Sequence, residues 1–352
     1  MKHLLNFALI AITFAIFSTS ISSCSNDEDI TPKLSIPKTI NLVPLMTIAG
    51  DHSHNDMAGV AEEGDSWREQ LLKAGYKCDI KDNCYQVGLG DFEDIQEIWI
   101  KHLRDAIKTI DSPKASKSTS TKQYTSKDTR LKFAKTSNTA VLLVTFGSTM
   151  EGPHSTYSKE VAAFRKAFPG TDVFMAFTSP LCISRWFTKK NEYYGQPYEY
   201  FEAFKTLAYE NVYVQSLHAT KGVEFNGGKN SEGTLHGLKN YYDLFVGQNP
   251  SVKTCLGLPL LSSVEDIKAV GDFIYNEYKA EILNGASLVL MGHGNEEDAD
   301  SPMSTANTYL EVEKYLQSKN SDIYVGTVDC PTVSFDRVLE ELNKKYGVAK
   351  KK

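Results

Sequence analysis

The stretch NLVPLMTIAGDHSHNDM, residues 41–57, decides how the rest of this chain is interpreted. Its apolar run over residues 42–48 predicts a buried parallel strand, and the chain then turns at Gly50. Asp51, His52, His54 and Asp56 follow at once. Because ligands in open α/β folds bind at the carboxyl ends of the strands, we expect these side chains to belong to a functional site.

Composition limits the classes of function. The chain has 352 residues, 41% of them hydrophobic, which is enough for one large core or two ordinary ones. Its net charge is -6 and its pI is about 5.8, and no arginine-rich face is visible in the sequence. A nucleic-acid partner is therefore not expected.

The N-terminus has the pattern of a targeting segment. Lys2 precedes an apolar stretch over residues 4–17, which is too short to span a bilayer. Residues 1–23 resemble a bacterial lipoprotein signal peptide, with Cys24 as the lipidated residue and residues 24–38 as a tether. An ordinary cleaved secretory signal is the alternative. Both predict export, and the first predicts a cell-envelope protein anchored in the membrane through Cys24, in the periplasm or at the outer membrane.

Apolar runs alternate with amphipathic stretches, as is typical of βα units around parallel sheets. The spacing predicts helices over residues 62–74, 91–110 and 264–283, and a short strand over 76–80. Residues 111–139 are rich in Ser, Thr and Lys, and we predict a mobile linker there. Cys78 and Cys84 could close a small disulfide loop in an oxidising compartment.

An internal repeat predicts two similar half-domains. VLLVTFGS (141–148) matches LVLMGHGN (288–295), DVFMAFTS (172–179) matches DIYVGTVD (322–329), and VQSLHATKGVE (214–224) matches LVPLMTIAGDH (42–52). One half-domain would be continuous, residues 140–285, and the other split, residues 39–110 plus 286–347. We therefore predict an α/β fold of two half-domains, each a parallel sheet flanked by helices, with a cleft between them. The split order is the signature of circular permutation.

The repeat also predicts the site. It places Glu224 at the position of His52, and His293 and Asp329 follow two further strands of the split half-domain. Two imidazoles and a carboxylate, from His52, His293 and Asp329, would suit a first-row divalent metal. Glu224 could transfer protons from the opposite wall. His218, at the end of another strand, is a candidate ligand contact.

These motifs, together with LGLPLLSS, GDSW and GLG, resemble the anaerobic sirohydrochlorin cobalt chelatases, the single-subunit class II type. The resemblance implies ATP-independent insertion of Co²⁺ into sirohydrochlorin, with Fe²⁺ or Ni²⁺ as alternative metals and no nucleotide. It implies that His293 and His52 are the metal-binding and catalytic histidines. Asp329 would be the third metal ligand, where the family has a glutamate one methylene longer. Glu224 would lie close to the tetrapyrrole. From its position in the repeat Glu224 is also a candidate catalytic residue, and His218, at its strand end, is a candidate contact of the tetrapyrrole.

Two functions remain open from the sequence. The histidine pair favours a chelatase of the cobalamin-biosynthesis type. The export signal favours a lipoprotein of the cell envelope that binds haem or another tetrapyrrole without inserting metal. Either would have a tetrapyrrole partner, and a homo-oligomer is compatible with both.

Overall fold

The computed structural model describes residues 37–59, 65–111, 114–230, 233–235, 237–294 and 305–346. The described residues all lie within one compact unit, Pro37–Lys352. The predicted signal peptide and nearly all of the predicted tether lie outside the described residues. Within the described residues, no helix combines the length and apolar character needed to cross a membrane.

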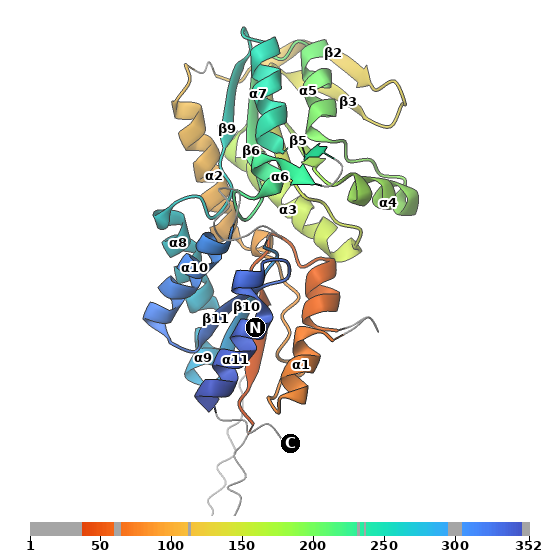
Figure 1. The fold of residues 1–352 in the computed structure, drawn as a ribbon. Helices are drawn as coiled ribbons and strands as arrows, with labels where there is room; N and C mark the ends of the chain where they lie inside the picture. Colours follow the sequence, from red (N-terminus) through yellow and green to blue (C-terminus); the bar gives the residue numbers. More distant parts are fainter. Residues whose placement is uncertain are drawn as a thin grey trace, which may run out of the picture. The chain divides into compact units, whose positions relative to one another are not determined.

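Two parallel sheets organise the chain (Figure 1). The larger sheet has the strand order β5 (Asp172–Phe177), β4 (Thr139–Thr145), β6 (Asn211–Ser216) and β9 (Lys253–Gly257). The smaller sheet has the order β11 (Ile323–Thr327), β10 (Ser287–Gly292) and β1 (Ile40–Pro44). The predicted α/β class is confirmed, and the smaller sheet takes its strands from both ends of the described chain.

The strand pair β4–β6 of the larger sheet and the strand pair β10–β1 of the smaller sheet have the same register. Leu142 in β4 stands opposite Val214 in β6, and Val289 in β10 stands opposite Leu42 in β1. These are the residues that the sequence repeat aligned, so the repeat is confirmed at the level of strand pairing. That the order is a circular permutation of a relative's order stays a prediction.

The fourth strand of the smaller sheet is reduced to two bridges, so the strand predicted over residues 76–80 is wrong. Thr39 pairs with Lys77 and Leu42 pairs with Cys84, and the chain loops out between them. The Asn83 amide donates to Asn41 Oδ1 at 2.6 Å and closes the loop onto β1. The Cys78 and Cys84 sulfurs are buried, unbonded thiols 3.8 Å apart.

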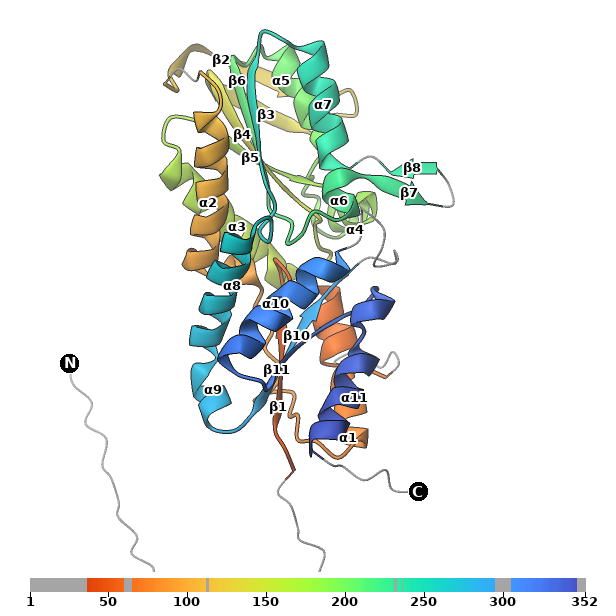
Figure 2. The same cartoon turned by 60° about the vertical axis from the view of Figure 1, so that its left-hand side comes forward.

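Helices cover both faces of each sheet (Figure 2). On the larger sheet, one face carries α2 (Glu93–Lys108) and α3 (Glu151–Ala167), and the other carries α5 (Pro197–Thr206) and α7 (Leu238–Gln248). The smaller sheet lies between α10 (Ala306–Lys319) on one face and α1 (Trp67–Lys73) and α11 (Phe335–Tyr346) on the other. The helix predicted over residues 264–283 breaks at Tyr278 into α8 (Val264–Glu277) and α9 (Lys279–Leu283).

The half-domains exchange helices, which the predicted boundaries at residues 110 and 285 did not anticipate. Helix α2 follows the smaller sheet's segment in sequence but packs on β6 and β9 of the larger sheet. Helix α8 follows the larger sheet but packs on α10. The cause is the apolar face of α2, whose Trp99 and Leu103 are fully buried in a core that continues through both half-domains.

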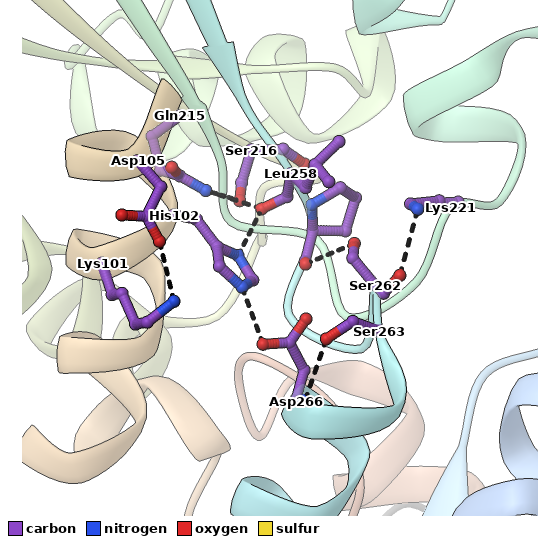
Figure 3. A network of polar contacts seen from close by, with 11 residues as sticks. Lys101, His102, Asp105, Gln215, Ser216, Lys221, Leu258, Ser262, Ser263 and Asp266 are labelled. Carbon is purple, nitrogen blue, oxygen red and sulfur yellow. Dashed lines mark hydrogen bonds and ion pairs between the residues drawn. The ribbon is translucent and has the colours of Figure 1, made fainter. Parts of the chain in front are cut away.

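A histidine joins the exchanged helices. Figure 3 shows His102 of α2 between the segment after β9 and the start of α8. Its Nδ1 lies 3.0 Å from the Leu258 carbonyl oxygen, and its Nε2 lies 2.9 Å from Asp266 Oδ1. The ring therefore ties both helices to the end of the larger sheet, in agreement with a structural role.

The predicted linker is wrong: residues 111–139 contain an antiparallel hairpin of β2 (Lys117–Thr125) and β3 (Lys132–Ser137). Phe133 packs against Phe174 of β5, with 4.5 Å between ring centroids, and Leu131 is buried. The Lys135 ammonium donates to the Leu207 carbonyl oxygen at 3.1 Å. A few apolar residues in a polar segment, alternating with period two, are enough to attach it to the core.

Replacing Trp99 by alanine should lower the free energy of unfolding by about 3–5 kcal/mol, because it opens a cavity where the exchanged helix meets the shared core. Glu97→Ala, on the exposed side of the same helix, should change it by less than about 0.5 kcal/mol. Urea unfolding of both variants tests this. Equal effects would contradict a packing role for α2 between the half-domains.

Candidate functional site

Two neighbouring strands of the smaller sheet bring a histidine and a carboxylate together. His293 follows β10 and Asp329 follows β11. The Asp329 amide donates to the His293 carbonyl oxygen at 2.8 Å, which extends the parallel ladder beyond the strands. His293 Nε2 lies 3.5 Å from Asp329 Oδ2. The predicted pairing of these two residues at one sheet edge is confirmed.

Close packing fixes the position of His293. A Cβ atom on Gly292 would lie 2.3 Å from Cε1 of Tyr309, and one on Gly294 would lie 2.9 Å from Cβ of Cys330. Gly294 also has a φ of +81°, which disfavours any other residue. Tyr309, from α10, is a buried neighbour of the site that the sequence reasoning missed, since it lies in an ordinary amphipathic helix.

His52 reaches the same place from the other end of the chain. It precedes a single π-helical turn, η1 (Ser53–Met57), and π turns occur often at functional sites. Its ring meets the His293 ring edge-on, with 4.6 Å between centroids and 81° between planes. The predicted meeting of the two histidines is thus confirmed, although 241 positions separate them in the numbering.

A carboxylate orients His52. Its Nδ1 lies 2.6 Å from Asp56 Oδ2, one helical turn on. The i, i+4 spacing of His52 and Asp56 is the signal in the sequence for this pair. Because Asp56 engages Nδ1, the lone pair at Nε2 is the one that this arrangement directs toward a ligand.

Glu224 belongs to the facing half-domain. It lies in α6 (Val223–Asn226), after β6, where the shared register makes it the counterpart of His52. Burial raises the pKa of the Glu224 carboxyl, while the Thr178 hydroxyl and the charge of His293 oppose that shift.

The turns after the strands of the two half-domains are in contact. A Cβ atom on Gly50 would lie 3.8 Å from Ser148 Oγ, which is ordinary contact distance. The Thr47 hydroxyl donates to the Leu217 carbonyl oxygen at 2.6 Å, and these residues follow β1 and β6 respectively. His52, His293 and Asp329 on one side therefore face Glu224 on the other.

His218 is separate from this group in its contacts. It is 8% exposed, and its Nδ1 lies 2.8 Å from the Ser216 hydroxyl oxygen. Its Nε2 has no hydrogen-bond partner among the described residues. Burial lowers the pKa of His218 to about 4, so the ring is neutral at pH 7. Its contact with a tetrapyrrole stays a prediction.

The side chains of His52, His293 and Asp329 are suited to bind a cation weakly. Among the described residues, no three His, Cys, Asp or Glu side chains are arranged as ligands of one metal ion. His52, His293 and Asp329 are adjacent, but several of their polar atoms already have partners. His293 Nε2 lies 3.5 Å from Asp329 Oδ2, His293 Nδ1 lies 2.9 Å from the Gly294 carbonyl oxygen, and His52 Nδ1 lies 2.6 Å from Asp56 Oδ2. A bound cation would have to compete with these contacts, which favours weak and reversible binding. Two facing α/β half-domains, with His52, His293 and Asp329 at the strand ends of one of them, define the class: a candidate protein that binds divalent metal ions.

The chain belongs to the cobalt chelatase (CbiK) family, whose sequence profile matches residues 20–108 and 139–350. The part left between these segments contains the β2–β3 hairpin. The resemblance stated from the sequence is confirmed.

Curated relatives match over shorter stretches. The sirohydrochlorin cobaltochelatase of Salmonella typhimurium is 38% identical over 68 residues, covering 19% of this chain and 24% of that protein. The sirohydrochlorin cobaltochelatase CbiKC of Nitratidesulfovibrio vulgaris is 32% identical over 74 residues, covering 21% and 24%. These matches span about a quarter of each relative. The solved structure of SirB from Bacillus subtilis with Fe³⁺ aligns with a TM-score of 0.41 and 15% identity, over 58% of this chain and 71% of that one.

The buried neutral His218 should make stability depend on pH. Its pKa of about 4 is below the value of about 6.5 expected in the unfolded chain, so its contribution is complete above pH 6.5 and is lost as the pH falls toward 4. The loss should reach about 3 kcal/mol. Urea unfolding at about pH 7.5 and about pH 5 should show a smaller decrease in His218→Gln than in the wild-type chain. Parallel decreases would contradict this.

Proposed function

We propose that this protein is a metal chelatase that inserts Co²⁺ into sirohydrochlorin without ATP. The observation that carries the proposal is the contact between His52 and His293, with Asp329 beside them and Glu224 opposite. Family membership and the names of the two curated relatives support it. The chain's own residues supply the two functions that insertion requires: a weak metal site and proton acceptors.

In this proposal, His52, His293 and Asp329 hold the metal substrate. Imidazole nitrogens and a carboxylate oxygen are ligands that first-row divalent ions accept. Fe²⁺ and Ni²⁺ would be accommodated by the same donors, so the choice of Co²⁺ rests on the names of the relatives. Asp56 would hold the His52 ring in the tautomer whose Nε2 carries the lone pair. Three ligands that also contact one another can release the ion to the four nitrogens of the macrocycle.

Insertion releases two pyrrole protons for each divalent metal that enters the ring. Glu224 is suited to accept one of them, because burial raises the pKa of its carboxyl toward the working pH and so makes the carboxylate a better base. A histidine that has given up the metal can accept the other. Glu224, on the side opposite the metal ligands, would draw its proton away from the entering cation.

Replacing His293 or His52 by alanine should reduce metal insertion at least about 100-fold, since each supplies a metal ligand and a proton acceptor. The assay follows the absorbance change of sirohydrochlorin with Co²⁺ under anaerobic conditions, using the full-length chain. His102→Gln is the matched control, because His102 contacts only structural partners in the described residues.

The same assay separates the chelatase from a tetrapyrrole carrier. Insertion by the wild-type chain no faster than in protein-free buffer, together with tight binding of sirohydrochlorin or haem, would overturn the chelatase and support the carrier. Fast insertion that survives both histidine substitutions would overturn the assignment of the site.

Asp329→Glu should change the preference among metals. The added methylene changes the reach of the carboxylate, whose Oδ2 atom now lies 3.5 Å from His293 Nε2. Because the distance between ligands helps to select among divalent ions, the ratio of Co²⁺ to Ni²⁺ insertion rates should shift by about threefold or more. An unchanged ratio with unchanged rates would remove Asp329 from the proposed metal site.

We also propose that the chain is exported and anchored through a lipid on Cys24, on the basis of residues 1–38. Labelling of bacterial cells with an alkyne fatty acid should modify the wild-type chain and not Cys24→Ser. The variant should leave the membrane fraction. Labelling of both forms, or of neither, would contradict lipidation at this cysteine.

A further inference from the structure

Two cysteines that the proposed metal chemistry does not use lie together at the edge of the smaller sheet. Cys78 is 0% exposed and Cys84 is 6% exposed, and their sulfur atoms lie 3.8 Å apart. The sulfurs need to approach by only about 2 Å to reach the length of a disulfide bond. Buried cysteines often pack simply as small apolar side chains, so the surroundings of the pair decide between the two roles.

Backbone hydrogen bonds to β1 fix both ends of the segment that contains the two cysteines. The Ile40 amide donates to the Lys77 carbonyl oxygen at 2.9 Å, and the Leu42 amide donates to the Asn83 carbonyl oxygen at 2.7 Å. Lys77 and Asn83 directly precede the two cysteines, and residues 79–82 between them are exposed. The sheet therefore holds the sulfurs close together, and an opening of this short exposed loop would give a reagent access to them.

A positive charge lies near the pair. Arg68, in the first turn of α1, donates from Nε to the Ala58 carbonyl oxygen at 2.7 Å. The hydrogen bond from the Cys78 thiol is the main cause that lowers the pKa of the Cys84 thiol; burial opposes this shift, and the charge of Arg68 adds to it. The same hydrogen bond raises the pKa of the Cys78 thiol. Because the thiolate is the form that attacks a disulfide, Cys84 is the first nucleophile of the pair.

The segment after Cys84 contacts the turn that carries His52. The Gln86 side-chain nitrogen donates to the Ser53 carbonyl oxygen at 2.9 Å, and the Gln86 side-chain oxygen accepts from the Ser53 hydroxyl at 3.1 Å. Ser53 directly follows His52 and begins η1. A restraint on the cysteine pair can therefore reach the histidine turn through the two hydrogen bonds of one side chain.

We propose that Cys78 and Cys84 are a redox-active pair that forms a disulfide, and that this bond stabilises the turn that carries His52. The oxidant is itself a disulfide. The Cys84 thiolate attacks one of its sulfurs and releases one thiol, and Cys78 then attacks the Cys84 sulfur of the mixed disulfide and releases the second thiol. The two cysteine sulfurs lose two electrons, which the oxidant gains, and their two protons go to the released thiols. This inference goes beyond the proposed metal chemistry and does not depend on it.

The edge of the smaller sheet is the place where such a bond has most effect. Two isolated bridges, rather than a continuous ladder, join the segment of the cysteines to β1. A bond between Cys78 and Cys84 closes a loop of seven residues and restricts the states open to that loop when it detaches. The oxidised edge should therefore open less often than the reduced one.

The first test detects the bond. The folded full-length chain is reduced, freed of reductant, incubated with glutathione disulfide, alkylated in denaturant and digested with trypsin. Cleavage after the intervening Lys81 places the cysteines in separate peptides, residues 78–81 and 82–101, which a disulfide should join until a reductant is added. Cys255, also buried, is the internal control and should remain a free thiol. If Cys78 and Cys84 both remain free, or only bind glutathione singly, the redox pair is wrong.

The second test measures the effect on the histidine turn. Backbone hydrogen exchange over residues 50–59 should be at least about threefold slower in the oxidised chain than in the reduced chain. Gln86→Ala should still form the disulfide but lose this difference, whereas Val87→Ala, at the next and exposed position, should keep it. Cys78→Ala should exchange at one rate under both conditions.

Equal exchange in the oxidised and reduced wild-type chain would overturn the effect on the turn, and this comparison requires no variant to fold. Neither test uses a metal or a tetrapyrrole. A failure here therefore leaves the chelatase proposal intact, and a chain that inserts no cobalt can still pass both tests.

Discussion

The parallel pairing of β1 with β10 is the interaction on which the rest of the structure depends. Residues 40–44, near the start of the described chain, form a ladder with residues 287–291, near its end. Without this ladder the smaller sheet would have only two strands, and His52 and His293 would have no reason to meet. Because parallel strands end at the same edge, the pairing converts a large separation in sequence into contact between two imidazole rings. The exchange of α2 and α8 then joins the two half-domains, since α2 packs on β6 and β9 of the larger sheet and α8 packs on α10, which covers the smaller one.

The repeated fold is symmetric in its backbone and asymmetric in its side chains. Equivalent strands share their register, and equivalent turns share their hydrogen bonds. At the strand ends, however, His52 corresponds to Glu224, and His293 corresponds to Phe146. The electrostatic consequence is that a half-buried carboxyl of raised pKa faces a pair of imidazoles. A duplicated fold can provide such an unequal pair of walls by substitution at a few positions.

The predictions from sequence succeeded where the pattern was local or repeated. The strand ends at His52, His293 and Asp329 were visible because apolar runs stop at glycine and polar residues, and the repeat identified Glu224 as the counterpart of His52. The predictions failed where the local sequence pattern is weak and tertiary packing determines the structure. Residues 111–139 look like a linker because Ser, Thr and Lys dominate, yet Leu131 and Phe133 attach the hairpin to a core that the segment itself does not reveal. The strand predicted over residues 76–80 failed because a loop closed by Asn83 interrupts it.

The amino-acid sequence by itself determined the α/β class, the two half-domains, the family resemblance and the residues of the candidate site, because strand periodicity and repeated motifs are properties of neighbouring residues. Only the tertiary structure decided which half-domain each long helix covers, that Asp56 rather than another group orients His52, that Tyr309 packs beneath Gly292, and that Phe146 remains exposed at the end of β4. These four features depend on which surfaces meet when the two sheets pack together. The free energy of burial that favours one packing over another is a sum over contacts between residues that are distant in sequence.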